Sequence, residues 1–143
     1  MLCGSFTGIR ATHTRGHFTR AVLEGVSLSL LDSKLYFDGL GVTHKPVATI
    51  IGGGAKGELW RQITADVLGM TLRVTESSDS SLGSAMLAGV ALGVFSDAKE
   101  AVSLCIKDKC ITEPNPENTE KYRKIFERYK KIAAALSPIY HEV

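Results

Sequence analysis

The sequence has few cysteines, and their arrangement argues against stabilisation by disulfide bonds or by a structural zinc ion. Cys3, Cys105 and Cys110 are the three present, an odd number, and no two of them have the Cys-x-x-Cys spacing of a zinc ribbon. Neither a disulfide framework nor a structural zinc site is therefore expected. A reducing compartment such as the cytoplasm fits this cysteine usage best.

Long apolar runs and clustered charge of one sign are also absent. No segment approaches the roughly 20 apolar residues needed to cross a bilayer, and the first residues lack the basic-then-apolar order of a signal peptide. The formal net charge is only +2, too small to indicate a nucleic-acid or anionic-membrane partner. We expect a soluble, unexported, cytoplasmic protein.

What remains is the composition of an ordinary globular protein. The 143 residues are 44% hydrophobic and 22% charged, close to the averages for soluble domains. A chain of this length suits one unit with one core. We therefore expect residues 1–143 to form a single domain.

Hydrophobic periodicity predicts alternating helices and strands, which is typical of the α/β class. The expected elements are, in order, a long helix from its N-cap Thr14 to the glycines at 39–41, a strand over 47–51, a helix from Leu59 that ends at Gly69, a strand over 71–75, a helix over 82–93 after a polar capping segment at 77–81, a short amphipathic segment over 97–106, and a last helix from Asn115-Pro116. Residues 47–75 then form a βαβ unit whose two strands are parallel. The first of these strands is almost entirely apolar, as expected for a strand that is covered on both faces.

Apolar side chains at helical spacing predict which helix faces are buried. The long helix is expected to bury Phe18, Ala21, Val22, Val26, Leu30 and Leu31, and the last helix Tyr122, Ile125, Phe126, Tyr129, Ile132, Ala133 and Leu136, opposite a solvated charged face. Gly25 and the nearby Ser27 and Ser29 lower the helix propensity of the long helix, so either another element packs closely there or the helix depends on tertiary contacts. The small residues of 82–93 allow another helix or a strand to approach the backbone closely.

The most informative local motif is the glycine turn, residues 52–54, between a strand and a helix. Missing Cβ atoms allow a ligand to touch the backbone, and amides at a helix start favour an anion. A phosphate-cradling P-loop is excluded because Glu58 and Leu59 follow Gly57 where Lys and Ser or Thr are required. Gly52-x-Gly54-x-x-Gly57 fits a dinucleotide fingerprint, with Glu76 as its ribose-binding acid. This spacing alone is compatible with a site for a nucleoside triphosphate, with a site for NAD, and with a turn that binds no ligand.

A resemblance that extends well beyond the glycines favours the first of these. Segments 12–17, 20–26, 52–56, 60–69 and 82–90, with Gly93, look, in this order, like the C-terminal domain of the FGGY carbohydrate kinases. Within that family the xylulose kinases look most similar, so D-xylulose is the expected sugar. The resemblance implies the C-terminal portion of an actin-like ATPase (ribonuclease H-like) domain, with ATP in a cleft between two domains.

The resemblance also implies which residues bind the nucleotide. The adenosine side of the site would consist of Gly52, Gly53, Gly54, Ala55, Lys56 and Glu58. Gly57 departs from the family pattern, in which serine is common, so a side-chain contact from that position is not expected.

The catalytic machinery of the family has no counterpart in this chain. The phosphate loop, the catalytic aspartate and the second phosphate motif all lie upstream of the matched segments, and phosphoryl transfer requires such positioned groups. We expect no catalytic residue here, a fragment that is inactive alone, and Mg²⁺ and sugar binding only in the complete enzyme. A non-catalytic interaction module is the third hypothesis, and a homo-oligomer is left open.

Three other candidates have structural interpretations that we prefer. His13 and His17 are one helical turn apart, but no third ligand accompanies them, so a metal site is not expected. Asp66 has apolar neighbours, which favours a capping or packing role. Trp60 is expected to anchor its helix in the core.

Overall fold

The computed structural model describes residues 4–77 and 80–140 and has two compact units. Unit 1 comprises the described parts of Met1–His44, Ile63–Gly69 and Pro114–Val143, and unit 2 comprises those of Lys45–Gln62 and Met70–Glu113. The elements are α1 (Arg15–Gly39), β1 (Val47–Thr49), α2 (Gly53–Lys56), α3 (Glu58–Leu68), β2 (Thr71–Thr75), α4 (Ser80–Ala91), α5 (Ala98–Cys105), β3 (Asp108–Thr112) and α6 (Pro116–Tyr140). This order confirms the predicted α/β class and most of the predicted elements.

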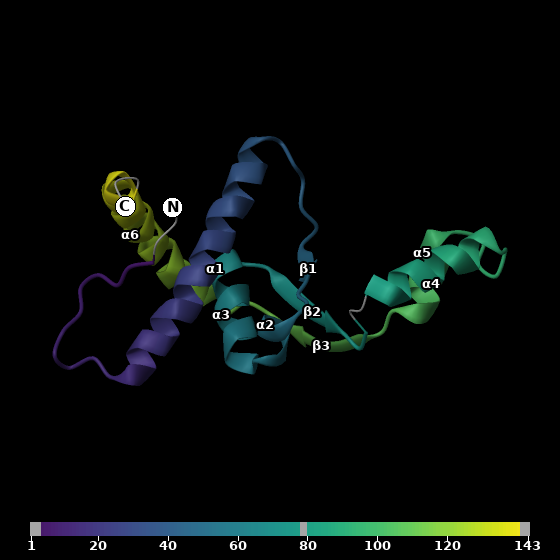
Figure 1. Ribbon diagram of the computed structural model, residues 1–143, viewed down its shortest axis with the longest axis horizontal. Coiled ribbons are helices and arrows are strands. Elements are labelled where there is room, and N and C mark those ends of the chain that lie inside the picture. The colour runs from purple at the N-terminus through teal and green to yellow at the C-terminus, as the bar shows by residue number, and fades with distance from the viewer. Residues whose placement is uncertain (1–3, 78–79, 141–143) are drawn as a thin grey trace. The chain divides into compact units, whose positions relative to one another are not determined.

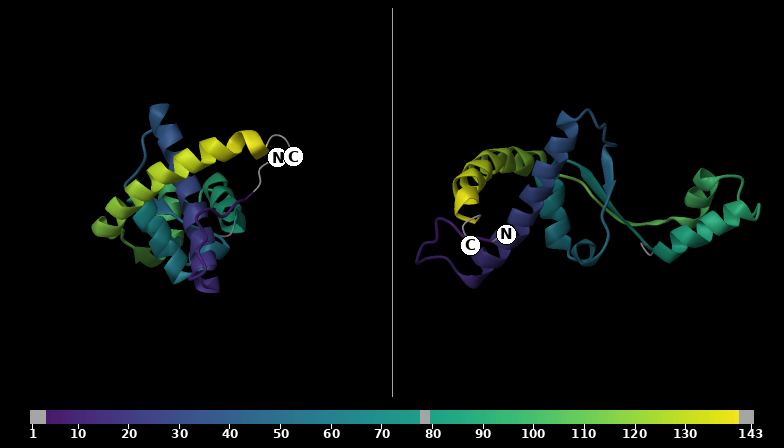
Figure 2. Two further views of the ribbon diagram at one scale, coloured as in Figure 1. Left: turned by 90° about the vertical axis from the view of Figure 1, so that its left-hand side faces the viewer. Right: turned by 45° about the horizontal axis from the view of Figure 1, so that its top comes forward.

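The core of unit 1 forms where α1, the end of α3 and α6 meet (Figures 1 and 2). Its buried side chains come in pairs from the three helices, which are Leu28 and Leu31, Ile63 and Val67, and Tyr122 and Phe126. Removal of this apolar surface from water is the main stabilising term for the unit.

The buried face of α1 differs from the predicted one. Thr14 is the N-cap, as expected, but the buried residues are Ser27, Leu28 and Leu31, whereas Val22, Val26 and Leu30 are exposed. The Ser27 hydroxyl lies 3.0 Å from the hydroxyl of Thr64 on α3, which confirms close packing at this small residue. Because α1 is apolar on more than one face, periodicity alone could not indicate which face packs on α3.

Asp66 has the structural role that its apolar surroundings suggested. Its side chain is buried, with the residue only 3% exposed. One carboxylate oxygen accepts a hydrogen bond from the backbone N–H of Asn115 at 2.7 Å, and the other accepts one from the Asn118 amide at 3.0 Å. The Asn115 side chain in turn caps α6 by accepting from the N–H groups of Glu117 and Asn118. Asp66 thus fixes the start of α6 against α3.

Polar contacts also join α6 to α1. The Tyr122 hydroxyl donates to a carboxylate oxygen of Glu24 at 2.8 Å and accepts from the Arg20 guanidinium at 3.3 Å. Burial, together with the adjacent Glu24 carboxylate, raises the pKa of Tyr122, because ionisation would place a second negative charge there.

This shift predicts a loss of stability at alkaline pH. The pKa of Tyr122 is higher in the folded than in the unfolded chain, so its contribution is complete below the ordinary tyrosine pKa of about 10 and is lost as the pH rises through the folded value. Tyr122→Phe should therefore destabilise the chain by about 1–3 kcal/mol at neutral pH, and the difference from wild type should shrink above about pH 10. Urea unfolding of both proteins across this range tests it, and a difference independent of pH would contradict it.

Unit 2 is built on a sheet with the strand order β1-β2-β3. β1 and β2 are parallel, with Val47 opposite Thr71, so the βαβ unit at 47–75 is confirmed. β3, which the sequence patterns did not indicate, pairs antiparallel with β2.

The expected burial of the first strand was wrong. β1 covers only Val47–Thr49, and Val47 and Ile51 are 42% and 61% exposed. The exposed residues 47, 49 and 51 alternate with the half-buried residues 48 and 50, so one face of this segment is open.

Two helices, α4 and α5, connect β2 to β3 and pack against each other (Figure 1). Asp97 caps α5 by accepting from the N–H of Glu100 at 2.8 Å. The small-residue helix packs against α5. Its close contact at Gly89 is with the loop that follows it, where an added Cβ would lie 2.7 Å from the Phe95 ring. Part of the predicted capping segment, residues 78–79, lies outside the described residues.

Candidate functional site

The glycine turn begins with a backbone conformation that only glycine adopts readily. The last backbone bond from the β1 side runs from the N–H of Ile50 to the carbonyl of Arg73 at 2.9 Å. Gly52 then has φ 81° and ψ −162°, in a region that is almost closed to residues with a Cβ. This residue turns the chain from the sheet into α2.

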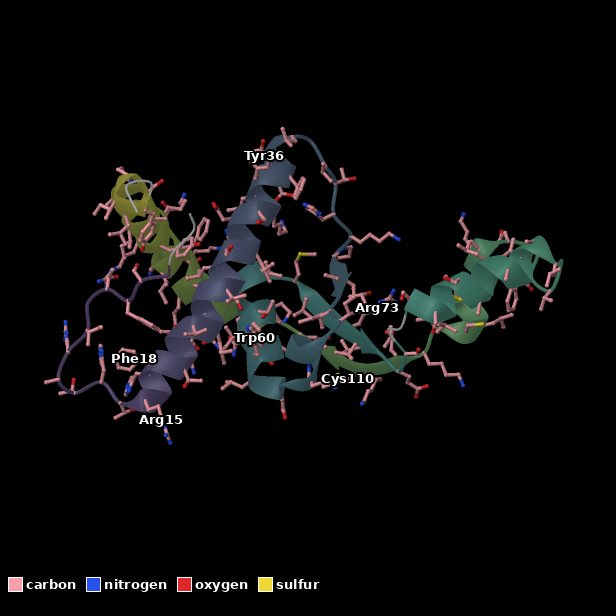
Figure 3. The ribbon with its side chains drawn as sticks, in the orientation of Figure 1. Arg15, Phe18, Tyr36, Trp60, Arg73 and Cys110 are labelled. Carbon is pink, nitrogen blue, oxygen red and sulfur yellow. The ribbon has the colours of Figure 1, made fainter. Side chains whose placement is uncertain are left out.

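The other two glycines of the turn have different surroundings. An added Cβ on Gly53 would meet no atom within 4 Å, whereas one on Gly54 would lie 3.2 Å from the Trp60 ring. Figure 3 shows Trp60 on α3, beside α2. Trp60 is half-buried and packs on the backbone of Gly54, so it anchors α3 to the turn. Because Gly54 has no side chain, the Trp60 ring can pack on its backbone. Because Gly53 has none either, and no ring covers it, its backbone is accessible.

The residues after the turn divide into buried and exposed positions. Ala55 is buried, and both Lys56 and Glu58 are exposed. Gly57 is extended, with φ −87° and ψ 113°, which separates α2 from α3. Because α2 is a single turn long, the helix-dipole part of our expectation is weak, and access to the backbone is the stronger argument for a ligand.

Arg61 also belongs to this site, although the sequence patterns did not single it out. Its Nη1 donates a hydrogen bond to the carbonyl oxygen of Ala55 at 2.6 Å. Its Nε is buried and has no hydrogen-bond partner among the described residues. Its position one helical turn after Gly57 was the available signal.

The structure contains part of the geometry expected for a dinucleotide-binding site. Glu76 directly follows β2 and is exposed, and its backbone N–H donates to the carbonyl of Lys107 at 2.9 Å. Because β1 and β2 are parallel, the glycine turn and Glu76 follow strand ends at the same edge of the sheet. Local geometry alone therefore does not separate the two nucleotide classes.

The histidines near the N-terminus make local contacts. The His17 Nδ1 accepts from the backbone N–H of Thr14 at 3.1 Å, and the His13 Nδ1 accepts from that of Arg10 at 3.3 Å. Across the part of the chain that the structure describes, no group of three His, Cys, Asp or Glu side chains is placed to hold a metal ion.

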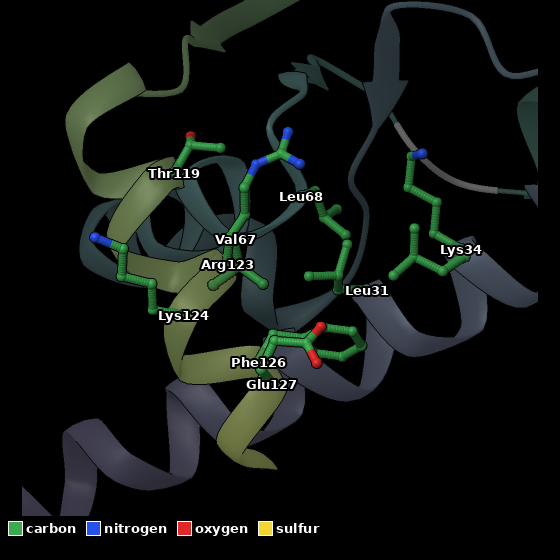
Figure 4. Close-up of a pocket in the computed structure, with 10 residues that line it drawn as sticks. Leu31, Lys34, Val67, Leu68, Thr119, Arg123, Lys124, Phe126 and Glu127 are labelled. Atoms are coloured by element: carbon green, nitrogen blue, oxygen red, sulfur yellow. The ribbon is translucent and has the colours of Figure 1, made fainter. Parts of the chain in front are cut away.

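A surface hollow in unit 1 is lined by residues outside the glycine turn. It has a volume of about 360 Å³ and is lined by residues of α1, α3 and α6, among them Leu31, Val67 and Phe126 (Figure 4). The glycine turn belongs to unit 2. None of residues 52–58 lines this hollow.

Comparison with known proteins decides the family. The model of the FGGY family of carbohydrate kinases, C-terminal domain, matches residues 2–92. The chain belongs to this family. Its members are ATP-dependent phosphotransferases, and the dinucleotide-binding alternative receives no support from the comparisons.

Individual relatives agree on the family and differ in the sugar. A xylulose kinase of Staphylococcus epidermidis is 38% identical over 130 residues, which are 90% of this chain and 26% of that protein. A gluconokinase of Bacillus licheniformis is 34% identical over an alignment of 146 positions, which covers 98% of this chain and 27% of that protein. The chain thus spans about a quarter of the length of these relatives.

A solved structure confirms the fold. The crystal structure of xylulose kinase from Rhodospirillum rubrum matches with a TM-score of 0.86 and 28% identity, over 98% of this chain and 28% of that chain. The structure therefore has the C-terminal portion of an actin-like ATPase fold. Within the described residues, no helix combines the length and apolarity needed to cross a bilayer.

Proposed function

We propose that this chain supplies the adenosine side of the ATP site of a sugar kinase. The residues that we assign to this role are Gly52, Gly53, Gly54, Ala55, Lys56 and Glu58. In this proposal the 143 residues act as one part of the nucleotide-binding domain, and the groups that transfer the phosphate lie in the rest of the enzyme.

The observation that supports the proposal best is the exposed backbone at Gly52 and Gly53. Nothing lies within 4 Å of a Cβ added at either position, so a flat adenine or a ribose has direct access to the main chain there. Lys56 and Glu58 are exposed on the same short segment and can add polar contacts. Bound ATP would supply the phosphate, and these residues would hold and orient its adenosine part.

We further propose D-xylulose as the sugar that the complete enzyme phosphorylates. The support is the name of the Staphylococcus epidermidis relative, at 38% identity. The gluconokinase relative, at 34% identity, makes gluconate the second candidate. Kinase assays with both sugars distinguish them, but they require a complete enzyme.

Nuclear magnetic resonance can test the nucleotide site directly, because the chain is only 15.4 kDa. Titration with ADP should shift the amide signals of residues 52–58, and titration with NADH should not. A chimera in which this chain replaces the matching quarter of the Staphylococcus epidermidis xylulose kinase tests the same site in a complete enzyme. If neither protein binds an adenine nucleotide through residues 52–58, the proposal is wrong.

Gly53→Ala provides the sharpest single substitution. The new methyl group meets open space in the free protein, so the unfolding temperature should stay the same or rise slightly, since alanine also has the higher helix propensity. The methyl group would occupy the accessible face, and we expect the affinity for ADP to fall by about tenfold or more, a cost near 1.4 kcal/mol. Calorimetric titration and thermal unfolding of the same sample measure both quantities. Unchanged affinity would show that the nucleotide does not approach Gly53.

A further inference from the structure

Two neighbouring side chains of α3 contact two neighbouring residues of α2. The Trp60 ring lies against Gly54, close enough that a Cβ there would be 3.2 Å from it. The Arg61 guanidinium donates to the carbonyl of Ala55 at 2.6 Å. Because consecutive side chains on a helix point about 100° apart, these contacts hold α2 from two directions.

The hydrogen bond from Arg61 replaces one that the helix cannot make for itself. Gly57 is extended, so the chain leaves the helical conformation between α2 and α3. Carbonyl groups at the end of a helix have no intrahelical donor, and Arg61 provides one for Ala55. A guanidinium donor is charged and geometrically fixed, so the bond sets the position of α2.

Burial of the Arg61 side chain is energetically unfavourable at one atom, and packing alone does not explain why it is retained. Its Nε is buried and has no partner in the described part of the chain. A buried donor without a partner is unfavourable, and native proteins retain few of them. Such an arrangement is understandable if the geometry that Arg61 imposes on α2 is needed for another purpose.

We propose that Arg61 is a positioning residue for the nucleotide, holding α2 so that the accessible backbone of Gly52 and Gly53 is preformed for adenosine. This inference rests on the proposed function. Arg61 acts through Ala55 and does not itself touch the nucleotide. Loss of its hydrogen bond therefore weakens nucleotide binding and leaves the sugar and the transfer step unaffected.

Variants of Arg61 test this in the full chain with ADP as the probe. Arg61→Ala should weaken ADP binding about 10- to 100-fold, the range for loss of one charge-assisted hydrogen bond. Arg61→Lys keeps the charge but has a shorter reach and no fork, so its affinity should be intermediate. Arg123→Ala is the matched control, because the Arg123 side chain is 73% exposed and its ion pair with Glu120 is long, at 4.0 Å.

Kinetics of the chimera separate positioning from a general structural role. Arg61→Ala should raise the KM for ATP by the same factor, with kcat and the KM for the sugar unchanged. A merely structural role would lower kcat through loss of active protein and leave both KM values alone, which would overturn the inference. If Arg61→Ala does not fold, Arg61→Lys decides, and wild-type affinity in that variant would also overturn it.

The two proposals fail in different ways. A wild-type protein that binds no adenine nucleotide, either as the chain or as the chimera, contradicts the proposed function. A wild type that binds ADP together with an Arg61→Ala variant that binds it equally well contradicts only the role of Arg61.

Discussion

Replacement of Phe126 by alanine should lower the free energy of unfolding by about 3–5 kcal/mol, the usual cost of removing a buried aromatic side chain. Phe126 is 4% exposed and lies in the core that α1, α3 and α6 share. Its ring stacks on Tyr129 with 6.0 Å between the centroids, and the Lys130 ammonium lies 5.1 Å from its centre. The truncation therefore removes apolar burial, an aromatic pair and a cation–π contact together.

Urea unfolding followed by circular dichroism measures this loss. The neighbouring Ile125 is the control, because it is on the same helix but 43% exposed, and Ile125→Ala should cost much less. Similar losses for the two variants would show that α6 does not pack through Phe126. Wild-type stability in Phe126→Ala would contradict the described core of unit 1.

Gly52→Ala should have the second large effect, and we expect it on both stability and binding. The φ of 81° and ψ of −162° at Gly52 lie in a region where a residue with a Cβ is strained by on the order of 1–3 kcal/mol. The turn must either store this strain or adopt another conformation. In either case the entry into α2 changes, and we expect the affinity for ADP to fall by about tenfold or more.

Gly25→Ala controls for the general effect of replacing glycine. Gly25 lies inside α1, and a Cβ there would meet nothing within 4 Å, so that substitution should be neutral or slightly stabilising. Thermal unfolding and calorimetric titration with ADP measure the three proteins side by side. A Gly52→Ala variant with wild-type affinity would mean that the backbone at Gly52 does not shape the site.

Local sequence signals predicted most of the elements. Thr14 and Asn115 marked helix starts because capping chemistry is short-range, and the parallel pairing of β1 with β2 followed from one βαβ pattern. β3 was missed because Asp108–Thr112 has little apolar alternation, and its pairing with β2 depends on a strand that is distant in sequence. The exposure of Val47 was also unpredictable, since an apolar sequence does not show which face of the sheet is covered.

The candidate site was predictable to the same limited extent. The glycine turn could be found because consecutive glycines between a strand and a helix indicate a tight turn with an accessible backbone. The different surroundings of Gly53 and Gly54 could not, because they depend on where the Trp60 ring packs. Arg61 was missed for a similar reason: its bond to Ala55 requires the extended conformation at Gly57, which residue spacing does not reveal.

The contact between Gly54 and Trp60 has an evolutionary consequence. A Cβ at position 54 would lie 3.2 Å from the indole ring, so a larger residue there requires the ring to shift or position 60 to carry a smaller side chain. The two positions should therefore covary among homologues. Position 53, which has no such neighbour, should be constrained only in those homologues that still bind a nucleotide.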